Sequence, residues 1–213
     1  MTVGLLYATR QEAEPFLALA AATPLAGPLP LFRVPETIHP ACVLAVSGMG
    51  KVAAALAAAH LAQKHRATLL INAGLCGRLT AEKNWTVGDR LRIESAVEGD
   101  CDRFGSHEAA VECDLNWFPD LQAARLVTCD RPVFREDLRR QLAGLGEVAD
   151  MEGAAVARTA LFYGIPCAMV KGISDCAEPT GRRDIARNLA AVSEDIAATL
   201  VRELKQNAND ERP

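Results

Sequence analysis

Short runs of apolar residues alternate along this chain with longer segments in which apolar positions recur every three or four residues. A short apolar run bounded by turn residues is typical of a strand buried on both faces, and the longer recurrence is typical of a helix. The runs predict strands at 3–8, 41–46, 68–72, 88–95, 124–128, 147–150 and 166–172, with an edge strand at 31–34. The intervening segments predict helices at 10–22, 52–65, 134–142, 152–162 and 183–206.

This alternation predicts a single-domain α/β fold over residues 1–206, with a mostly parallel sheet covered by helices on both faces. Residues 207–213 are polar and are expected to form a disordered tail. Ligands of such sheets bind beyond the carboxyl ends of the strands. Functional residues are therefore expected at Thr9–Glu12, Ser47–Gly50, Gly74–Gly77, Thr128–Val133, Asp150–Glu152 and Ser174–Asp175, with the irregular segment 98–120 as a pocket rim.

Composition narrows the classes of function. The chain has 213 residues, 50% of them hydrophobic, and its 23 basic against 27 acidic residues leave no cationic surface for a nucleic acid. No apolar run reaches the ~18 residues of a transmembrane helix, so no membrane partner is expected. The first residues lack the basic and apolar regions of a signal peptide, which favours a cytoplasmic protein.

The cysteines suggest neither a metal site nor a disulfide framework. Their number is odd, and no two of them have the CxxC spacing of zinc or redox motifs. In the cytoplasm they are expected to be reduced and mostly buried. The seven positions are Cys42, Cys76, Cys101, Cys113, Cys129, Cys167 and Cys176.

Two predicted strand ends carry glycines. Ser47–Lys51 reads SGMGK and joins a strand to an alanine-rich helix, and Asn72–Gly77 reads NAGLCG. Glycine lets the backbone approach a ligand, and a helix N-terminus favours anions. Neither segment has the spacing of a Walker loop or of a GxGxxG fingerprint, so a tight structural turn remains an equal interpretation.

Three acidic positions also follow predicted strands. They are Glu12, the Asp150-Met151-Glu152 junction, and Asp175 after Ile173-Ser174. Alone, the Asp150–Glu152 junction is equally explained by helix capping, because acidic residues favour the first turn of a helix. Asp175 is alternatively part of a cap or a turn, and Glu12 a solvated helix residue.

Taken in order, the segments resemble the nucleoside phosphorylase and nucleosidase superfamily, in particular the 5′-methylthioadenosine/S-adenosylhomocysteine nucleosidases. That resemblance implies an α/β/α domain with a mixed, partly barrel-like sheet. It rests on the first strand with Glu12, SGMGKVAAA at 47–55, NAGLCGRL at 72–79, VGD at 87–89, DCDRFG at 100–105, DMEGAA at 150–155 and KGISDCAE at 171–178.

The resemblance also implies roles for single residues. Asp175 matches the general acid at N7 of the purine, Glu152 the carboxylate on the ribose hydroxyls, and Glu12 the carboxylate that activates water. Phe104 matches a residue that reaches into the neighbouring subunit's site, which implies a homodimer. Met49, Gly74, Cys76, Val133, Met151 and Ser174 match substrate-binding positions.

Elementary chemistry agrees with this division of roles. When an N-glycosidic bond breaks, the sugar becomes cationic and the purine leaves readily only if an acid protonates it. Burial would raise the pKa of Asp175 so that it holds that proton near neutral pH, and the carboxylate of Glu152 would stabilise the cationic sugar. No metal or cofactor is required. Asp175 favours adenine, because a protonated carboxyl donates to N7 while its other oxygen accepts from a 6-amino group.

The sequence leaves two points open: whether water or phosphate attacks the sugar, and which group the nucleoside carries at its 5′ position. Phosphorylases of the superfamily carry a glycine-rich phosphate loop after the first strand, whereas this chain has Thr9-Arg10-Gln11-Glu12. The carboxylate of Glu12 would repel phosphate and favours hydrolysis, although Arg10 keeps phosphorolysis possible. Leu75 replaces the usual serine, and 128–134 differs from the usual purine-binding stretch. Futalosine hydrolases and hopanoid-associated relatives are similar too, and an inactive nucleoside-binding relative remains an alternative.

Overall fold

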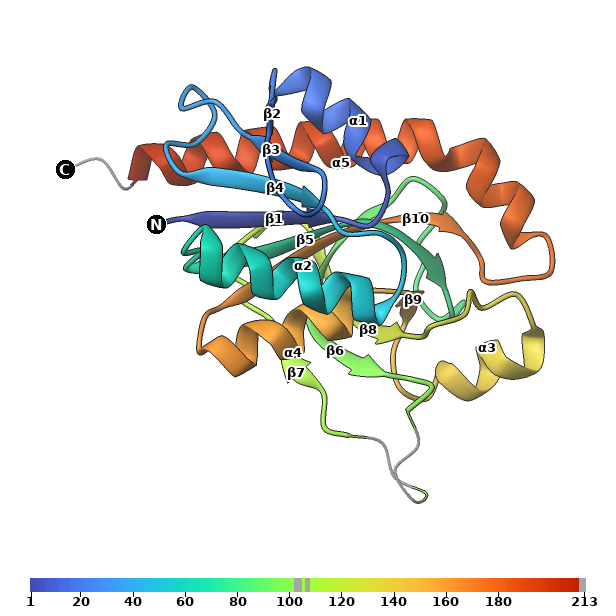
Figure 1. The fold of residues 1–213 in the computed structure, drawn as a ribbon. Helices are drawn as coiled ribbons and strands as arrows, with labels where there is room; N and C mark the ends of the chain where they lie inside the picture. The colour runs from blue at the N-terminus through green and yellow to red at the C-terminus, as the bar shows by residue number, and fades with distance from the viewer. Residues whose placement is uncertain (102–104, 106–107, 211–213) are drawn as a thin grey trace.

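A computed structural model describes residues 1–101, 105 and 108–210 of the chain (Figure 1). The strands are β1 (Val3–Tyr7), β2 (Thr23–Leu25), β3 (Leu31–Arg33), β4 (Cys42–Val46), β5 (Leu69–Arg78), β6 (Arg90–Glu98), β7 (Val111–Glu112), β8 (Gln122–Thr128), β9 (Val148–Asp150) and β10 (Cys167–Asp175). The helices are α1 (Arg10–Leu19), α2 (Lys51–Lys64), α3 (Glu136–Leu142), α4 (Gly153–Tyr163) and α5 (Gly181–Asp210).

The strands form one mixed sheet that closes partly into a barrel. Its order is β10-β6-β8-β9-β5-β1-β4-β3-β2, and β10 also pairs with β5. The strands β5, β10, β6, β8 and β9 therefore make a closed ring, from which β1, β4, β3 and β2 extend as an open sheet. The central pairs β1–β4, β1–β5 and β5–β10 are parallel, while β5–β9 and β6–β10 are antiparallel. The α/β fold with a mixed, partly barrel-like sheet, which the resemblance implied, is confirmed. The mostly parallel sheet expected from the alternation is not found, because β2–β3, β3–β4 and β6–β7 also pair antiparallel.

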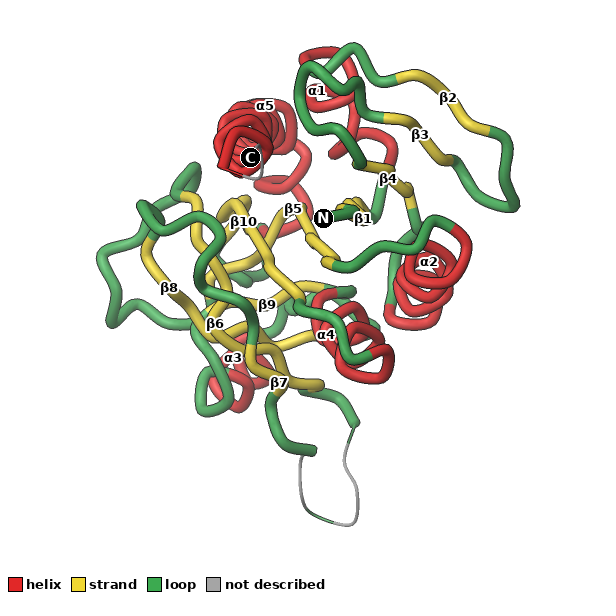
Figure 2. The backbone as a smooth tube through the Cα atoms, turned by 90° about the vertical axis from the view of Figure 1, so that its left-hand side faces the viewer, coloured by secondary structure: helices red, strands yellow, loops and turns green. Residues whose placement is uncertain are grey.

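Helices cover the sheet on two sides, α1 and α5 on one and α2 and α4 on the other (Figure 2). Successive side chains of a strand point to opposite faces, so β1 contributes to both layers. Leu5 and Tyr7 pack in the cluster that contains Phe16 of α1, and Leu6 packs in the cluster that contains Leu61 of α2. Buried alanines at 54, 57 and 58 let α2 lie close to the sheet.

Two strands run farther than the sequence predicted. Strand β5 continues through its glycines to Arg78, and β10 continues to Asp175, so Gly74–Gly77 and Ser174–Asp175 lie within strands rather than after them. The reason is their mutual pairing, which runs from Cys167↔Leu70 to Asp175↔Gly77 and outweighs the local turn preference of glycine.

Smaller differences concern the chain's periphery. Thr23–Leu25, which lies outside every strand predicted from the sequence, forms edge strand β2. Pro24 is tolerated there because an edge position needs no donor. Helix α1 ends at Leu19 rather than at 22. Helix α5 includes residues 207–210 of the expected tail, and 211–213 lie outside the described residues.

Within the described part of the chain, no helix combines the length and apolar character needed to cross a membrane.

Candidate active site

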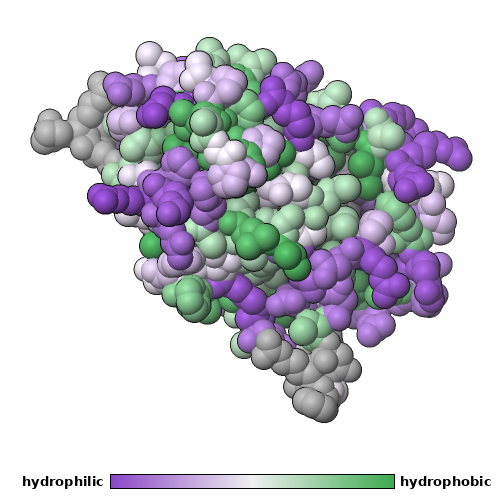
Figure 3. All heavy atoms as spheres, viewed as in Figure 1, coloured by the Kyte–Doolittle hydropathy of each residue, from purple (hydrophilic) through white to green (hydrophobic). Residues whose placement is uncertain are grey.

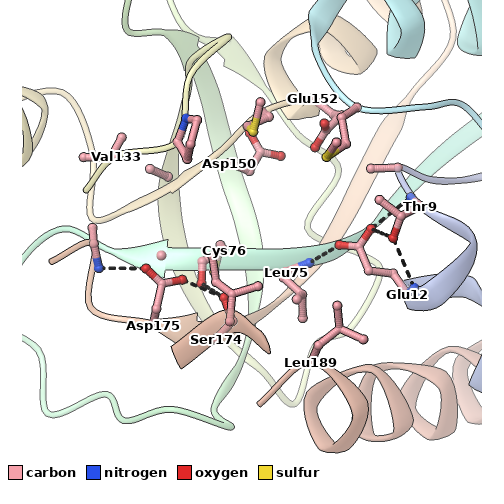
Figure 4. Close-up of a pocket in the computed structure, with 18 of the residues that line it drawn as sticks. Thr9, Glu12, Leu75, Cys76, Val133, Asp150, Glu152, Ser174, Asp175 and Leu189 are labelled. Carbon is pink, nitrogen blue, oxygen red and sulfur yellow. Dashed lines mark hydrogen bonds between the residues drawn. The ribbon is translucent and has the colours of Figure 1, made fainter. Parts of the chain in front are cut away.

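A cavity of about 260 Å³ lies at the carboxyl ends of β1, β5, β9 and β10 (Figure 4). Each of the six segments predicted from strand ends contributes to its wall, because parallel strands present these ends at one edge of the sheet. The lining comprises Ala8, Thr9, Gln11, Glu12, Met49, Leu75, Cys76, Gly77, Pro132, Val133, Phe134, Ala149, Asp150, Met151, Glu152, Ser174, Asp175, Ala177, Ile185 and Leu189.

Glu12 is fixed by the start of helix α1. Thr9 is the N-cap, and its backbone N–H and hydroxyl donate to Glu12 Oε2 at 3.0 and 2.8 Å in a reciprocal capping box. The backbone N–H of Leu75 donates to Glu12 Oε1 at 3.2 Å. Each carboxylate oxygen accepts up to two hydrogen bonds, so Oε1 keeps one acceptor position toward the cavity.

Glu152 is held by the glycine turn between β4 and α2. Gly48 and Gly50 both have positive φ, and the Gly50 N–H donates to Glu152 Oε1 at 2.7 Å. Burial and the neighbouring carboxylate of Asp150 raise the pKa of Glu152 to about 7. The turn is thus structural, as one interpretation of the sequence held, and it binds an anionic group of the protein itself.

A buried ion pair lies beside Glu152. Lys171 Nζ is 2.7 Å from Asp150 Oδ2, and both side chains are at least 98% buried. Asp150 also accepts hydrogen bonds from the Thr128 hydroxyl at 2.6 Å and from the Gly153 N–H at 2.8 Å. Burial lowers the pKa of Lys171, but the carboxylates of Asp150 and Glu152 outweigh it, so the pKa is raised and the ammonium is retained.

Asp175 occupies the opposite end of the cavity. Its Oδ1 accepts from the Ser174 hydroxyl at 2.7 Å, and its Oδ2 accepts from the Ala177 N–H at 2.9 Å. Burial raises the pKa of Asp175 although these two hydrogen bonds oppose the shift. Space for the carboxyl depends on glycine, since a Cβ at Gly77 or Gly181 would lie only 3.0 or 3.1 Å from Oδ2.

Comparison with known proteins decides the family. The model of the phosphorylase superfamily matches residues 2–205. The chain belongs to this superfamily. A futalosine hydrolase of Helicobacter pylori superposes with a TM-score of 0.85 at 20% identity over 97% of this chain and 99% of that one. An S-adenosylhomocysteine nucleosidase of Streptococcus pyogenes, solved with 5-methylthiotubericidin, gives 0.87 at 22% identity over 97% of both chains.

Most site residues expected from the superfamily resemblance lie together. Glu12, Glu152 and Asp175 line the cavity, and Gly74 packs against Glu12, where a Cβ would be 3.2 Å from Oε1. Burial raises the pKa of the Cys76 thiol, so it stays protonated. The substrate-binding positions that line the cavity are Met49, Cys76, Val133, Met151 and Ser174.

Other expectations are not met at this cavity. The guanidinium of Arg10 pairs with Glu14 at 2.7 Å and lies over the ring of Phe32, and Arg10 does not line the wall. The predicted rim 98–120 contributes none of its described residues to the lining. Phe104 lies outside the described residues.

Sequence reasoning missed two groups of site residues. Lys171 had a signal, since a lysine inside a strand buried on both faces requires a partner. Ile185 and Leu189 of α5 had none, because their approach to the cavity depends on how a distant helix packs. Among the described residues, no group of three or more His, Cys, Asp or Glu side chains is arranged to hold a metal ion.

Proposed function

We propose that this protein hydrolyses the N-glycosidic bond of a purine nucleoside that carries a 5′ substituent, releasing the free base. The observation that carries the proposal is the set of three buried carboxyl groups, Glu12, Glu152 and Asp175, around one cavity. Each is held by different partners, which allows the three to differ in protonation and in role.

Asp175 is proposed to protonate N7 of the purine. Its raised pKa favours the protonated form that a general acid needs. Each of its oxygens accepts one hydrogen bond from the protein, from Ser174 or from Ala177. Capacity remains on both oxygens, so the carboxyl can donate to N7 and accept from a 6-amino group, which favours adenine.

Glu152 and Glu12 are proposed to act at the sugar. Glu152 would accept hydrogen bonds from the ribose hydroxyls and stabilise positive charge at C1′, with Met151 beside the ring. Water held by Glu12 Oε1 would attack C1′ as the bond from C1′ to N9 breaks. Glu12 takes one proton from the water and Asp175 gives one to N7, so the reaction consumes only water and the two carboxyl groups are reset by exchange with solvent.

The charges at the sugar end favour water over phosphate. Glu12, Asp150 and Glu152 line this part of the wall, and the buried cation Lys171 is paired with Asp150. Arg10, the cation that kept phosphorolysis possible, is instead paired with Glu14. A phosphate dianion would meet an excess of negative charge, which opposes its binding.

The relatives support a nucleoside with a 5′ substituent without fixing which one. The Streptococcus pyogenes enzyme is described as an S-adenosylhomocysteine nucleosidase, and the Helicobacter pylori enzyme as a futalosine hydrolase. A nucleosidase of Neisseria meningitidis, 22% identical over 96% of this chain and 99% of its own with a TM-score of 0.84, was solved with methylthio-immucillin-A.

The test is release of free base from methylthioadenosine, adenosylhomocysteine, adenosine, inosine and futalosine, each with and without phosphate. We expect adenine release at a rate that does not change with phosphate. A strict requirement for phosphate would replace hydrolysis by phosphorolysis, and release from futalosine alone would change the substrate. Binding of adenine without turnover of any nucleoside would contradict an enzymatic role.

We also propose that the protein acts as a homodimer in the cytoplasm. The seven cysteines are free thiols in the structure, which supports the proposed compartment. Apolar side chains gather over α2 (Figure 3), where Val52 and Leu56 are 74% and 68% exposed, and Phe162 of α4 beside them is 83% exposed. A contiguous exposed apolar surface is typical of an interface. Met49, 69% exposed, joins this surface to the cavity.

The dimer is tested by mass in solution. We expect the native protein to have twice the monomer mass, and Leu56→Asp to reduce it because a buried charge opposes association. Val87→Asp, at another exposed apolar position, should keep the native mass. A monomeric native protein with full activity would contradict the dimer and the role implied for Phe104.

A further inference from the structure

Two cysteine thiols meet at the amino end of strand β10, away from the proposed catalytic cavity. Cys167 is the first residue of β10 and is buried, whereas Cys113 directly follows β7 and is half-buried. Both pack in the hydrophobic cluster that contains the buried residues of α2 and α4. Asp175 is at the other end of β10, about 26 Å along the strand, so the thiol pair is remote from the cavity.

The sheet explains why the two cysteines meet. Strand β8 pairs with β6 from Leu91 to Glu98 and occupies one of its edges. Strand β10 pairs with the first part of β6 and β7 with a later part, so these two strands follow one another along the other edge. At the junction, the Asp114 N–H donates to the carbonyl of Cys167 at 2.7 Å.

This junction places the two cysteines within reach of a disulfide. The Asp114 nitrogen and the Cys167 oxygen each lie about 2.4 Å from the Cα of Cys113 or of Cys167, so these Cα atoms are at most about 7.5 Å apart. Disulfides join Cα atoms that are about 4.4–6.8 Å apart and whose side chains converge. The side chains do converge, because the thiol of Cys167 donates a hydrogen bond to the sulfur of Cys113.

The two thiols differ in acidity and in access to solvent. The hydrogen bond with Cys113 and burial both raise the pKa of Cys167, so its thiol stays protonated. Cys113 is the more exposed of the two. A thiolate with access to solvent is the group that attacks a disulfide in solution. Cys113 is therefore placed to react first, and Cys167 is placed to attack the product.

We propose that Cys113 and Cys167 are a redox modification site, at which a low-molecular-weight disulfide oxidises the two thiols to an intramolecular disulfide. The Cys113 thiolate attacks one sulfur of the oxidant, and a small thiolate leaves as the mixed disulfide forms. Cys167 then loses its proton and attacks the sulfur of Cys113, which expels the second small thiolate. The two small thiolates take up the two protons that the cysteines lose, so one disulfide is consumed and one is formed.

The expected consequence is a reversible stabilisation of the fold. The disulfide would close a loop that contains β8, α3, β9 and α4, and such a cross-link restricts the unfolded chain. The folded chain needs little rearrangement, since the thiols are already in contact. Disulfides of reducing compartments are usually transient and respond to the redox state, which agrees with free thiols in this structure. The inference does not depend on the proposed nucleosidase function.

The first experiment maps the disulfide. The native protein is incubated with oxidised glutathione, its remaining thiols are blocked with iodoacetamide, and its peptides are identified by mass spectrometry. We expect two of the seven thiols to be lost and one cross-linked pair of peptides, joining Cys113 to Cys167, which dithiothreitol separates. Cys176→Ser, which removes another half-buried thiol, should form the same cross-link. Retention of all thiols, or a disulfide between any other pair, would overturn the proposal.

The second experiment tests the order of attack. Cys167→Ser should stop at the mixed disulfide of glutathione with Cys113, because the second thiol is missing. Cys113→Ser should leave Cys167 unmodified under the same conditions, because that thiol is buried and protonated. Modification of Cys167 in Cys113→Ser as fast as that of Cys113 in Cys167→Ser would overturn this order.

Thermal unfolding tests the consequence. Oxidation of the native protein should raise Tm by about 5–15 °C, and dithiothreitol should reverse the shift. The same treatment should leave the Tm of Cys113→Ser unchanged. A mapped disulfide without a rise in Tm would overturn the stabilisation.

Discussion

The two ends of the proposed catalytic cavity, named here the purine end and the sugar end after the roles proposed for them, hold a buried acid in different ways. At the purine end, Asp175 is hydrogen-bonded by Ser174 and Ala177 and makes no ion pair within the described residues. At the sugar end, Glu152 shares a small volume with Asp150 and Lys171. Burial is the main cause of the raised pKa at both ends. The carboxylate of Asp184 adds a smaller contribution at the purine end, whereas Asp150, Lys171 and Glu12 all contribute at the sugar end.

The comparison teaches that the burial of one carboxyl dominates the purine end, whereas several buried charges act on one another at the sugar end. A change at Asp175 should remain local and affect chemistry. A change at Lys171 or Glu152 should also lower the free energy of unfolding. The reason is that each charge at this end alters the desolvation penalty of the buried charges beside it.

The largest expected effect is at the purine end. Asp175→Asn should lower kcat by ~10²–10⁴ by removing the general acid, with little change in the unfolding transition. Steady-state base release and thermal unfolding measure the two quantities. Asp120→Asn, an exposed acid away from the cavity, is the matched control. Normal turnover in Asp175→Asn would remove this residue from the proton transfer.

The next effect is at the sugar end. Lys171→Met should reduce the free energy of unfolding by about 3–5 kcal/mol, because it leaves Asp150 buried without its cation. Denaturant unfolding measures this loss, and Lys64→Met at an exposed helix end is the control. Adding Asp150→Asn to Lys171→Met should recover part of the stability. Equal stability of Lys171→Met and the native protein would refute the interaction between these buried charges.

The smallest effect is a pH dependence. The pKa of Glu152 is about 7 in the folded protein against 4.5 for an ordinary glutamate, so between these values the folded state binds more protons than the unfolded state. The contribution of Glu152 to the free energy of unfolding is fully present below pH 4.5 and is lost as the pH rises through 7. The loss is on the order of 1–3 kcal/mol.

Denaturant unfolding of the native protein and of Glu152→Gln between pH 5 and 8 isolates this contribution. We expect the native protein to lose stability relative to the variant as the pH rises. Glu112→Gln, at an exposed strand position, should follow the native curve. Parallel curves for the native protein and Glu152→Gln would show that the pKa of Glu152 is not raised.

The sequence predicted that Glu12, Glu152 and Asp175 lie close together. This prediction does not depend on the loops, because parallel strands bring their carboxyl ends to one edge of the sheet. It did not predict how those groups are held. From the sequence, the turn that contains Gly50 was equally a ligand-binding segment or a structural turn, and only the structure shows that its N–H donates to Glu152. The ends of β5 and β10 were misplaced, since glycine predicts a turn and only pairing between distant strands overrides it.

The closed ring of strands also determines the order in which strand pairs can form while the chain is being synthesised. Strand β5 can pair with β1 early through Leu69–Asn72, but its contacts with β9 and β10 require residues 148–175. Contacts across such sequence separations form late, and an unpaired strand edge is prone to aggregation while it waits. The growing chain therefore carries the exposed edge of β5 through the translation of about half its length, and translation rate and chaperone access should control how much active protein is produced.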